Sequence, residues 1–276
     1  MALKREIVLV TGAGSGMGRE TAAHLAEEGL TVYAASRAPE KLDDLASERL
    51  IPTQMDITSA KSVSEVLETI RRRHGGIDIL VNNAGYGLVG AVEHVSEAEM
   101  TAQFDVNVFG TLRACKAAVP GMRERGGGII INISSFLGKI GLPLLTFYNA
   151  SKYAVEGITD SLRYELRGFN IRVHSVMPGF FDTQFARSNL QTNPETFDPG
   201  SPYAETVSTL APTILEQINR GNDPADVARL IRQIIADDAF PARVTVGDKA
   251  KKFIPMRREL SDEDFERRVR DYYGLT

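Results

Sequence analysis

The chain has 276 residues, of which 43% are hydrophobic, so it can bury one sizeable core without splitting into domains. Its formal net charge of −4 provides no basic surface for nucleic acid, and no apolar run approaches the roughly 20 residues of a membrane span. One cysteine excludes an internal disulfide, four scattered histidines form no metal-ligand cluster, and no secretory signal precedes the first strand, so we expect a cytoplasmic protein without metal, nucleic-acid or membrane partners.

Apolar runs alternate with amphipathic helical patterns throughout, which is typical of a doubly wound parallel sheet. Strands are predicted near residues 6–11, 31–36, 50–55, 77–82, 128–134, 171–177 and 243–246. Helices are predicted between them, centred near residues 22, 43, 66, 110, 158 and 230. The predicted fold class is α/β, a Rossmann-type parallel sheet of about seven strands flanked by helices on both faces, in a single domain over residues 1–276.

A glycine-rich turn follows the first strand and precedes a helix, with glycines at 12, 16 and 18. Glycines let the backbone approach a pyrophosphate, and the helix N-terminus offers unpaired N–H groups to it. Strand, turn and helix together are the context that a dinucleotide fingerprint requires.

The end of the second strand bears on cofactor choice. Sites for NAD commonly place an acid there to bond the ribose 2′-hydroxyl, but this chain has Ser36, followed by Arg37. A guanidinium suits a 2′-phosphate in charge and geometry, so NADP(H) is the preferred cofactor. NAD(H) stays possible, because Arg37 could be an exposed loop arginine.

Tyr148 and Lys152 are spaced to share one helix face, and Ser135 stands at the predicted end of a strand. An ammonium one turn from a phenol is expected to lower the pKa of that phenol. The serine could reach the same point from the sheet side, so the three side chains could bind a carbonyl oxygen and donate a proton to it. Alone, a Tyr-x-x-x-Lys pair is usually a surface pair, but here a cofactor motif precedes it.

In their order and spacing these motifs resemble those of short-chain dehydrogenases/reductases, over about the first 185 residues and more loosely to Val246. The chain looks most like the hydroxysteroid and retinol dehydrogenase branch. The matching motifs are Thr11-Gly12-x-x-x-Gly16-x-Gly18, Asn82-Asn83-Ala84-Gly85, Asn107, Ser135, Tyr148-x-x-x-Lys152 and Pro178-Gly179.

The resemblance implies four catalytic residues. Tyr148 would be the general acid/base, Ser135 would polarise the carbonyl, and Lys152 would hold the nicotinamide ribose and lower the tyrosine pKa. Asn107 would support a water that links Lys152 to solvent, and it could also kink its helix. The implied cofactor-binding residues are Gly12, Ser15, Gly16, Met17, Gly18, Ser36, Arg37, Asp56, Ile57, Asn83, Ala84, Gly85, Tyr148, Lys152, Pro178, Gly179 and Thr183. Asp56 has the alternative of capping the helix that follows it.

Residues 179–222 interrupt the alternation with four prolines, and such a long irregular segment is usually functional. We expect a substrate loop there. Apolar residues gather in this loop and between the serine and the tyrosine, which favours a substrate with an apolar body, although about half of them are expected to be core. The set is Leu137, Ile140, Leu142, Leu144, Leu145, Phe147, Phe180, Phe181 and Phe185. A C-terminal extension over residues 247–276, with mixed charges, suggests a solvated helix that covers the pocket or a subunit contact.

The leading hypothesis is an NADP(H)-dependent oxidoreductase that moves a hydride between nicotinamide and a carbonyl or secondary alcohol. One alternative is a 3-oxoacyl-carrier-protein reductase, and another is a nucleotide sensor without turnover, which the intact set of four residues disfavours. The resemblance also implies a homodimer or homotetramer through helices near residues 97–124 and 147–168, with Phe104, Val108, Leu112, Val155, Ile158 and Leu162 as apolar candidates.

Overall fold

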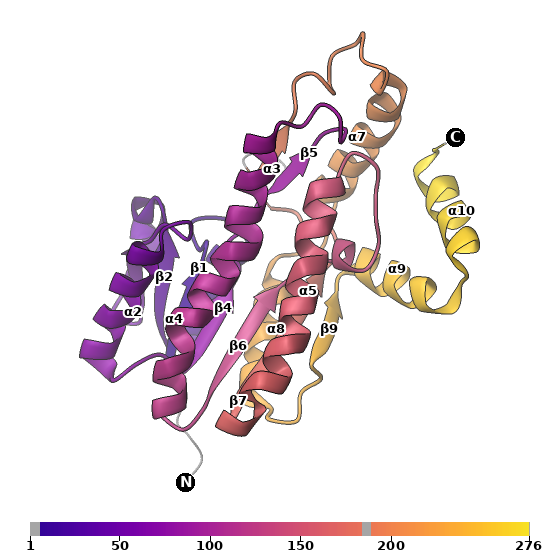
Figure 1. The fold of residues 1–276 in the computed structure, drawn as a ribbon. Helices are drawn as coiled ribbons and strands as arrows, with labels where there is room; N and C mark the ends of the chain where they lie inside the picture. Colours follow the sequence, from indigo (N-terminus) through magenta and orange to yellow (C-terminus); the bar gives the residue numbers. More distant parts are fainter. Residues whose placement is uncertain (1–5, 184–188, 276) are drawn as a thin grey trace.

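A computed structural model describes residues 6–183 and 189–275. Seven parallel strands form one sheet in the order β3-β2-β1-β4-β6-β7-β9 (Figure 1). Their bounds are β1 Ile7–Thr11, β2 Thr31–Ser36, β3 Leu50–Gln54, β4 Ile79–Asn82, β6 Gly128–Ile133, β7 Ile171–Pro178 and β9 Arg243–Val246. The predicted fold class is confirmed, and the strands lie within two residues of their predicted positions.

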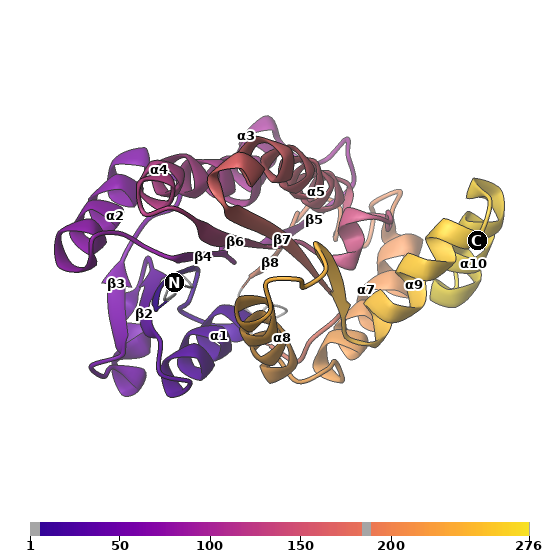
Figure 2. The ribbon, with the colours of Figure 1, turned by 90° about the horizontal axis from the view of Figure 1, so that it is seen from below.

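Helices cover both faces of the sheet (Figure 2). One face carries α2 Ala60–His74, α3 Glu97–Phe104, α4 Gly110–Glu124 and α5 Thr146–Leu166, and the other carries α1 Gly16–Glu27 and α8 Ala225–Ala236. The helix predicted near residue 43 is a 3₁₀ helix, η1 Pro39–Leu45. The acidic pair Asp43-Asp44 lies near its C-terminal end, where negative charge is unfavourable for the helix dipole, so a longer α-helix has little support.

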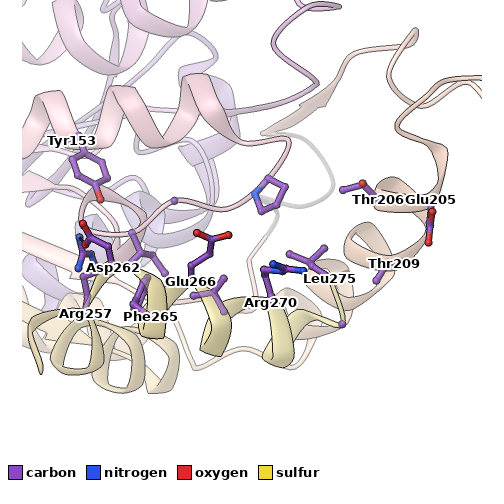
Figure 3. Close-up of a pocket in the computed structure, with 15 residues that line it drawn as sticks. Tyr153, Glu205, Thr206, Thr209, Arg257, Asp262, Phe265, Glu266, Arg270 and Leu275 are labelled. Carbon is purple, nitrogen blue, oxygen red and sulfur yellow. Dashed lines mark hydrogen bonds and ion pairs between the residues drawn. The ribbon is translucent and has the colours of Figure 1, made fainter. Parts of the chain in front are cut away.

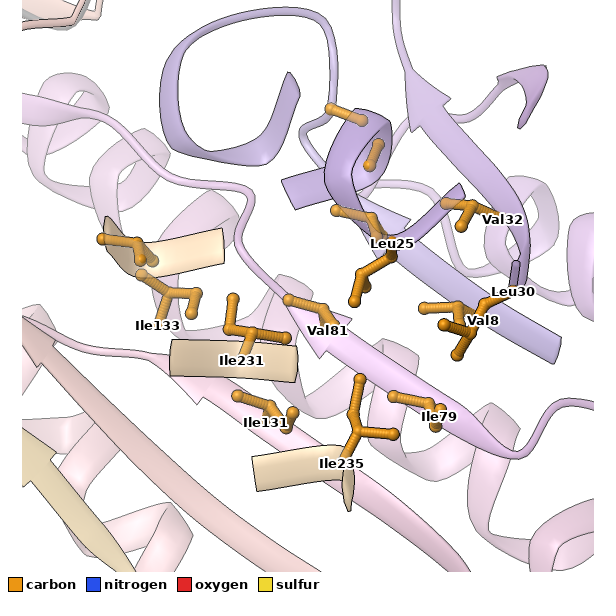
Figure 4. Close-up of a cluster of buried hydrophobic side chains, with 14 of the residues drawn as sticks. Val8, Leu25, Leu30, Val32, Ile79, Val81, Ile131, Ile133, Ile231 and Ile235 are labelled. Carbon is orange, nitrogen blue, oxygen red and sulfur yellow. The ribbon is translucent and has the colours of Figure 1, made fainter. Parts of the chain in front are cut away.

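Alternate residues of each buried strand face opposite layers, as the period of two requires. Val8 and Val10 of β1 join the layer beneath α1 and α8, while Ile7 and Leu9 join the layer beneath α2, α4 and α5. Figure 4 shows the first layer, where strand valines and isoleucines meet Leu25 of α1 and the isoleucines of α8. Burial on both faces explains why these strands read as continuous apolar runs.

The segment between β7 and β9 differs from its prediction. Residues 179–222 contain a short strand, β8 Leu190–Thr192, which pairs with β5 Gly87–Val89, and a helix, α7 Ala204–Asn219. The prolines suggested irregular chain, but Pro212 lies inside α7 because that helix packs Leu210, Ile214 and Ile218 into a third apolar cluster. Tertiary burial therefore outweighs the helix-breaking tendency of one proline.

The C-terminal extension forms two helices instead of one solvated helix, α9 Asp248–Glu259 and α10 Asp262–Tyr273. Phe253 and Ile254 of α9 and Phe265 of α10 are buried in the same cluster as the apolar residues of α7, and Figure 2 shows the three helices on the same side of the molecule. Throughout residues 6–183 and 189–275, no helix is both long and apolar enough to cross a membrane.

Candidate active site

The glycine-rich turn lies against the end of β4, at the point where strand order reverses around β1. Gly12 has φ +65°, and a Cβ there would lie 2.6 Å from Ala84 Cα, so only glycine fits. Asn83 Nδ2 donates to the carbonyl oxygens of Thr11 and Gly12 at 3.0 and 3.1 Å. The Thr11 hydroxyl accepts from the backbone N–H groups of Asn83 and Ala84. The two predicted cofactor motifs therefore form one unit at the carboxyl edge of the sheet, where α/β proteins bind ligands.

Helix α1 starts inside the turn, at Gly16, and Ser15 is its N-terminal flanking residue. A Cβ at Gly16 would lie 3.2 Å from Thr183 Cβ, so the turn also contacts the chain after β7. Met17 packs against the core layer beneath α1 and borders the main cavity. The free N–H groups of this first helical turn could hold a pyrophosphate.

Ser36 ends β2 beside the glycine-rich turn, and Arg37 follows it. A Cβ at Gly14 would meet Ser36 Oγ at 2.5 Å, so this serine faces the glycine-rich turn. Arg37 is exposed and has no ion-pair partner in the described part of the chain. Its charge contributes to lowering the pKa of the Asp56 carboxyl, after the larger effect of hydrogen bonds from Thr58.

Asp56 has a local structural role. Its Oδ1 accepts from the Thr58 N–H at 2.9 Å and from the Thr58 hydroxyl at 2.7 Å, closing a turn before α2. Ser59, not Asp56, caps α2, which corrects the capping alternative. Ile57 is buried against Gly110 of α4.

Ser135 and Tyr148 meet at the end of β6. Ser135 Oγ accepts from the Leu137 N–H at 3.1 Å, which leaves its own hydrogen free to donate, and it hydrogen-bonds the Tyr148 side chain. Burial raises the pKa of the Tyr148 phenol to about 12, and the bond from Ser135 offsets only part of that shift. The expected lowering of this pKa by Lys152 is wrong for this structure, because desolvation dominates.

Lys152 is buried on α5, one turn after Tyr148. Its Nζ donates to the carbonyl oxygen of Ile133 at 2.9 Å and lies 5.8 Å from the Tyr148 ring centroid. Burial lowers the pKa of the ammonium to about 8, while the charge of Glu156 opposes the change. The lysine therefore lies beneath the tyrosine and is anchored to the sheet.

Asn107 lies in a single π-helical turn, Asp105–Phe109, between α3 and α4. Such turns are frequent at functional sites. Its side chain exchanges two hydrogen bonds with the Tyr86 backbone and donates to Ser151 Oγ, all at 3.0 Å. A Cβ at Gly85 would lie 3.2 Å from Asn107 Oδ1 and 3.7 Å from Lys152 Nζ, so this glycine leaves open space beside both polar groups.

A cavity of about 360 Å³ opens above Ser135 and Tyr148. Pro178, Gly179 and Thr183 border it after β7, and the described side chains that line it carry no charge. Of the predicted apolar set, the residues that line it are Leu137, Leu144, Leu145, Phe180 and Phe181. Ile140 and Leu142 are buried in the third cluster instead, Phe147 lies outside the lining, and Phe185 lies outside the described residues. The cavity suits a neutral, apolar ligand whose reactive oxygen meets the serine and the tyrosine.

Several lining residues were missed from sequence. Leu210, Ile214 and Ile218 lie one turn apart on α7 and close the cavity. Their i, i+4, i+8 spacing was a readable helical signal, but the surrounding prolines obscured it.

A larger hollow of about 620 Å³ lies outside the cavity, between α10, α7 and the chain before α5 (Figure 3). It is walled by Tyr153, Arg257, Glu266 and Arg270 and contains none of the predicted catalytic residues. We place the candidate active site in the smaller cavity, because Ser135, Tyr148 and Met17 of the glycine-rich turn all line it. In the described part of the chain, no three His, Cys, Asp or Glu side chains gather where they could hold a metal ion.

Comparison with known proteins matches this geometry. A family model described as short chain dehydrogenase matches residues 6–194. The 3-ketodihydrosphingosine reductase of Bacteroides thetaiotaomicron is 35% identical over 274 residues, covering 99% of this chain and 100% of the relative. Retinol dehydrogenase 8 of Homo sapiens is 36% identical over 258 residues, covering 88% of this chain and 82% of the relative. A solved short-chain dehydrogenase from Streptomyces avermitilis has a TM-score of 0.83 at 33% identity, with 99% and 97% of the two chains covered.

Two further solved structures contain a nicotinamide cofactor. A short chain dehydrogenase from Burkholderia cenocepacia in complex with NADP has a TM-score of 0.75 at 26% identity and covers 100% of both chains. A short chain dehydrogenase/reductase from Burkholderia phymatum in complex with NAD has a TM-score of 0.79 at 25% identity and covers 97% of this chain and 96% of its own. Similar proteins thus bind either cofactor, and the likeness does not decide between them.

Proposed function

Since the chain belongs to the short-chain dehydrogenase/reductase family and is an oxidoreductase, we propose that it uses NADP(H) to interconvert a carbonyl and a secondary alcohol on a largely apolar molecule. The observation that supports this proposal most directly is the hydrogen-bonded pair of Ser135 and Tyr148 at the base of a cavity whose described lining is uncharged.

In the reduction direction, the substrate oxygen would accept hydrogen bonds from the Ser135 hydroxyl and the Tyr148 phenol. The nicotinamide, when bound, supplies the hydride. Tyr148 is protonated at neutral pH because its pKa is near 12, so it can donate its proton to the developing alkoxide. Lys152 would hold the nicotinamide ribose through its ammonium, and Asn107 would support the water that restores the proton.

The substrate class follows from the cavity. Phe180 and Phe181 after β7, and Leu210 and Ile214 on α7, surround the reacting position with apolar surface. A carboxylate or phosphate would find no described counter-charge inside, so neutral ketones, steroids and long-chain aldehydes are the compounds to test. Assaying such a panel with NADPH and NADH would decide the proposal, and no turnover with any of them would contradict it.

The preference for NADP(H) rests on Ser36 and Arg37. Ser36 presents no carboxylate to repel a 2′-phosphate, and the exposed Arg37 guanidinium, which forms no ion pair with the described residues, could bind it. A charge-assisted contact is worth roughly 1.5–3 kcal/mol, or about ten- to a hundred-fold in affinity. Arg37→Ala should therefore weaken NADPH binding by about that factor and leave NADH binding nearly unchanged. Ser36→Asp should favour NADH by adding a ribose acceptor and a repulsive charge.

Fluorescence titration of both cofactors against wild type and the two variants measures this preference. Arg73→Ala is the matched control, since this exposed arginine lies in the last turn of α2, before the amino end of β4, whereas Arg37 follows the carboxyl end of β2. Equal wild-type affinities for NADH and NADPH, unmoved by Arg37→Ala, would show that Arg37 is only a surface arginine.

Partners and location also remain proposals. We propose a homo-oligomer formed through α4 and α5, which cover the same face of the sheet (Figure 2). Leu112 is 38% exposed and the neighbouring Phe109 is 49% exposed, which supports a contact there. Val108 and Val155, expected to contribute to it, are buried within the chain itself. A cytoplasmic location, without nucleic-acid or membrane partners, remains an expectation from composition.

A further inference from the structure

Glu156 is a buried carboxylate on α5, one turn after Lys152, and it is only 2% exposed. Its Oε1 accepts a hydrogen bond from the Ser175 hydroxyl on β7, and its Oε2 lies 2.7 Å from Arg243 Nε on β9. Lys139 Nζ, in the turn after β6, lies 3.3 Å from the same Oε2. One carboxylate thus joins four segments of the chain beneath the active site.

This carboxylate is connected to the serine of the site through the 3₁₀ turn η3 Phe136–Gly138, which starts immediately after Ser135. Gly138 packs directly on α5, where a Cβ would lie 3.2 Å from Glu156 Cγ and 3.0 Å from the Lys152 carbonyl oxygen. The ion pair between Lys139 and Glu156 closes the same turn against the same part of the helix. The position of Ser135 relative to α5 therefore depends on this contact.

Glu156 also affects the lysine electrostatically. The charged groups around it are Lys139 and Arg243, together with Asp160, whose Oδ1 lies 2.5 Å from Arg243 Nη2. The Asp160 side chain is 47% exposed, whereas that of Glu156 is 3% exposed, so solvent screens the first charge far more than the second. Glu156 is accordingly the charge that opposes the effect of burial on the Lys152 ammonium.

We propose that Glu156 is a positioning residue that fastens the Ser135 turn to α5 and supplies the buried negative charge that keeps Lys152 an ammonium. The inference rests on the proposed function, in which that ammonium holds the nicotinamide ribose beside Tyr148. It extends the site by one helical turn, so that Tyr148, Lys152 and Glu156 follow one another along one face of α5.

The test is the titration of Lys152 in the cofactor-free protein, followed by NMR of labelled lysine side chains and assigned with Lys152→Arg. Glu156→Gln removes the charge and keeps the size. Its Lys152 signal should titrate at lower pH than in wild type, and Glu156→Asp should restore much of the difference. The pH above which kcat/KM for ketone reduction falls should decrease together with the Lys152 titration. For each pH unit of that decrease, the fraction of Lys152 that remains an ammonium at a given higher pH falls about tenfold.

Two variants control for loss of structure. Asp160→Asn makes the same charge change one turn further along α5 and should leave the Lys152 titration in place. Lys139→Gln removes the cation that competes with Lys152 for Glu156, and it should move the Lys152 titration to higher pH. Because the Lys139 side chain is one-third exposed, this variant keeps the test decisive if Glu156→Gln does not fold. An unchanged titration in Glu156→Gln, or in Lys139→Gln, would overturn the proposal. Absence of turnover with every carbonyl compound would contradict the proposed function but would leave the NMR result valid.

Discussion

Lys152 Nζ donates to the main-chain carbonyl of Ile133, the last residue of β6, at 2.9 Å. The bond ties the helix that carries the tyrosine to the strand that delivers Ser135 two residues later. The ammonium thus lies against the carboxyl end of β6, and the tyrosine hydroxyl hydrogen-bonds Ser135 instead. Tyr148, Ser135 and Lys152 are therefore held together by direct contacts between α5 and the end of β6.

Removing the phenol hydroxyl should separate chemistry from cofactor binding. Tyr148→Phe keeps the ring and loses the proton donor, so kcat for reduction should fall on the order of 10²- to 10⁴-fold. The cofactor dissociation constant, measured by fluorescence, should change little. A variant that retains more than about a third of wild-type turnover would rule out the role of Tyr148.

Lys152→Met should change the pH dependence of stability. The pKa of Lys152 falls from 10.5 to about 8 on folding, so between these pH values the unfolded chain binds more protons and the free energy of unfolding rises with pH. The variant lacks this group. The difference in free energy of unfolding, variant minus wild type, should therefore be about 3 kcal/mol more favourable to the variant at pH 7 than at pH 10.5, since one pKa unit is worth roughly 1.36 kcal/mol. Loss of the bond to Ile133 adds a cost that does not depend on pH.

Urea denaturation at the two pH values measures this difference, with exposed Lys116→Met as the control that removes no buried charge. The activity of Lys152→Met should be lost, because the variant lacks the ammonium that we propose to hold the ribose. A relative stability that does not change between pH 7 and pH 10.5 would show that the Lys152 ammonium carries no burial penalty.

Leu144 has φ +61°, a left-handed conformation that is unfavourable for leucine, and it lines the cavity. Its carbonyl accepts from the Gly90 N–H at 2.7 Å, which helps to hold that conformation. Leu144→Ala should lose about 2–5 kcal/mol of stability, while Leu144→Gly should be about 1 kcal/mol more stable than the alanine variant although it is smaller. Urea midpoints give the order, and the reverse order would mean that the strain is negligible. Both variants should accept bulkier ketones.

Gly18→Ala should disrupt the glycine-rich turn. The added methyl would lie 2.3 Å from Asn83 Nδ2 and 2.5 Å from the Gly12 carbonyl oxygen, which breaks the bonds joining the turn to β4. We expect a loss of at least about 2 kcal/mol and much weaker cofactor binding. Gly157→Ala, in an open position on α5, should instead gain about 0.5–1 kcal/mol. Equal thermal midpoints for the two variants would argue against close packing at Gly18.

The oligomer can be tested on α4. Phe109→Glu, immediately before α4, and Leu112→Glu, in its first turn, together place two charges on this exposed surface and should yield a monomer of about 30 kDa by light scattering. Val92→Glu changes a residue that is 59% exposed outside these helices and should leave the assembly intact. A wild-type monomer at micromolar concentration would contradict the proposed assembly.

The sequence alone determined the sheet and its ligand edge. Buried parallel strands read as continuous apolar runs, and the spacing of glycine, serine, tyrosine and lysine identified residues that the fold does bring together. These signals are local, so one chain segment carries each of them. Contacts between segments carry no such signal, which is why α9 and α10 were expected as one solvated helix. Helix α7 was expected as a loop because the prolines obscured its helical spacing.

Only the tertiary structure decided the electrostatics of the site. From spacing, Lys152 should lower the pKa of Tyr148, but burial raises that pKa and the lysine bonds to Ile133 instead. In the sequence, nothing distinguishes Glu156 from an ordinary helix glutamate. The structure shows that it is buried and contacts Ser175 and Arg243. Desolvation and long-range ion pairs depend on what surrounds a side chain in three dimensions, and residue order does not contain that information.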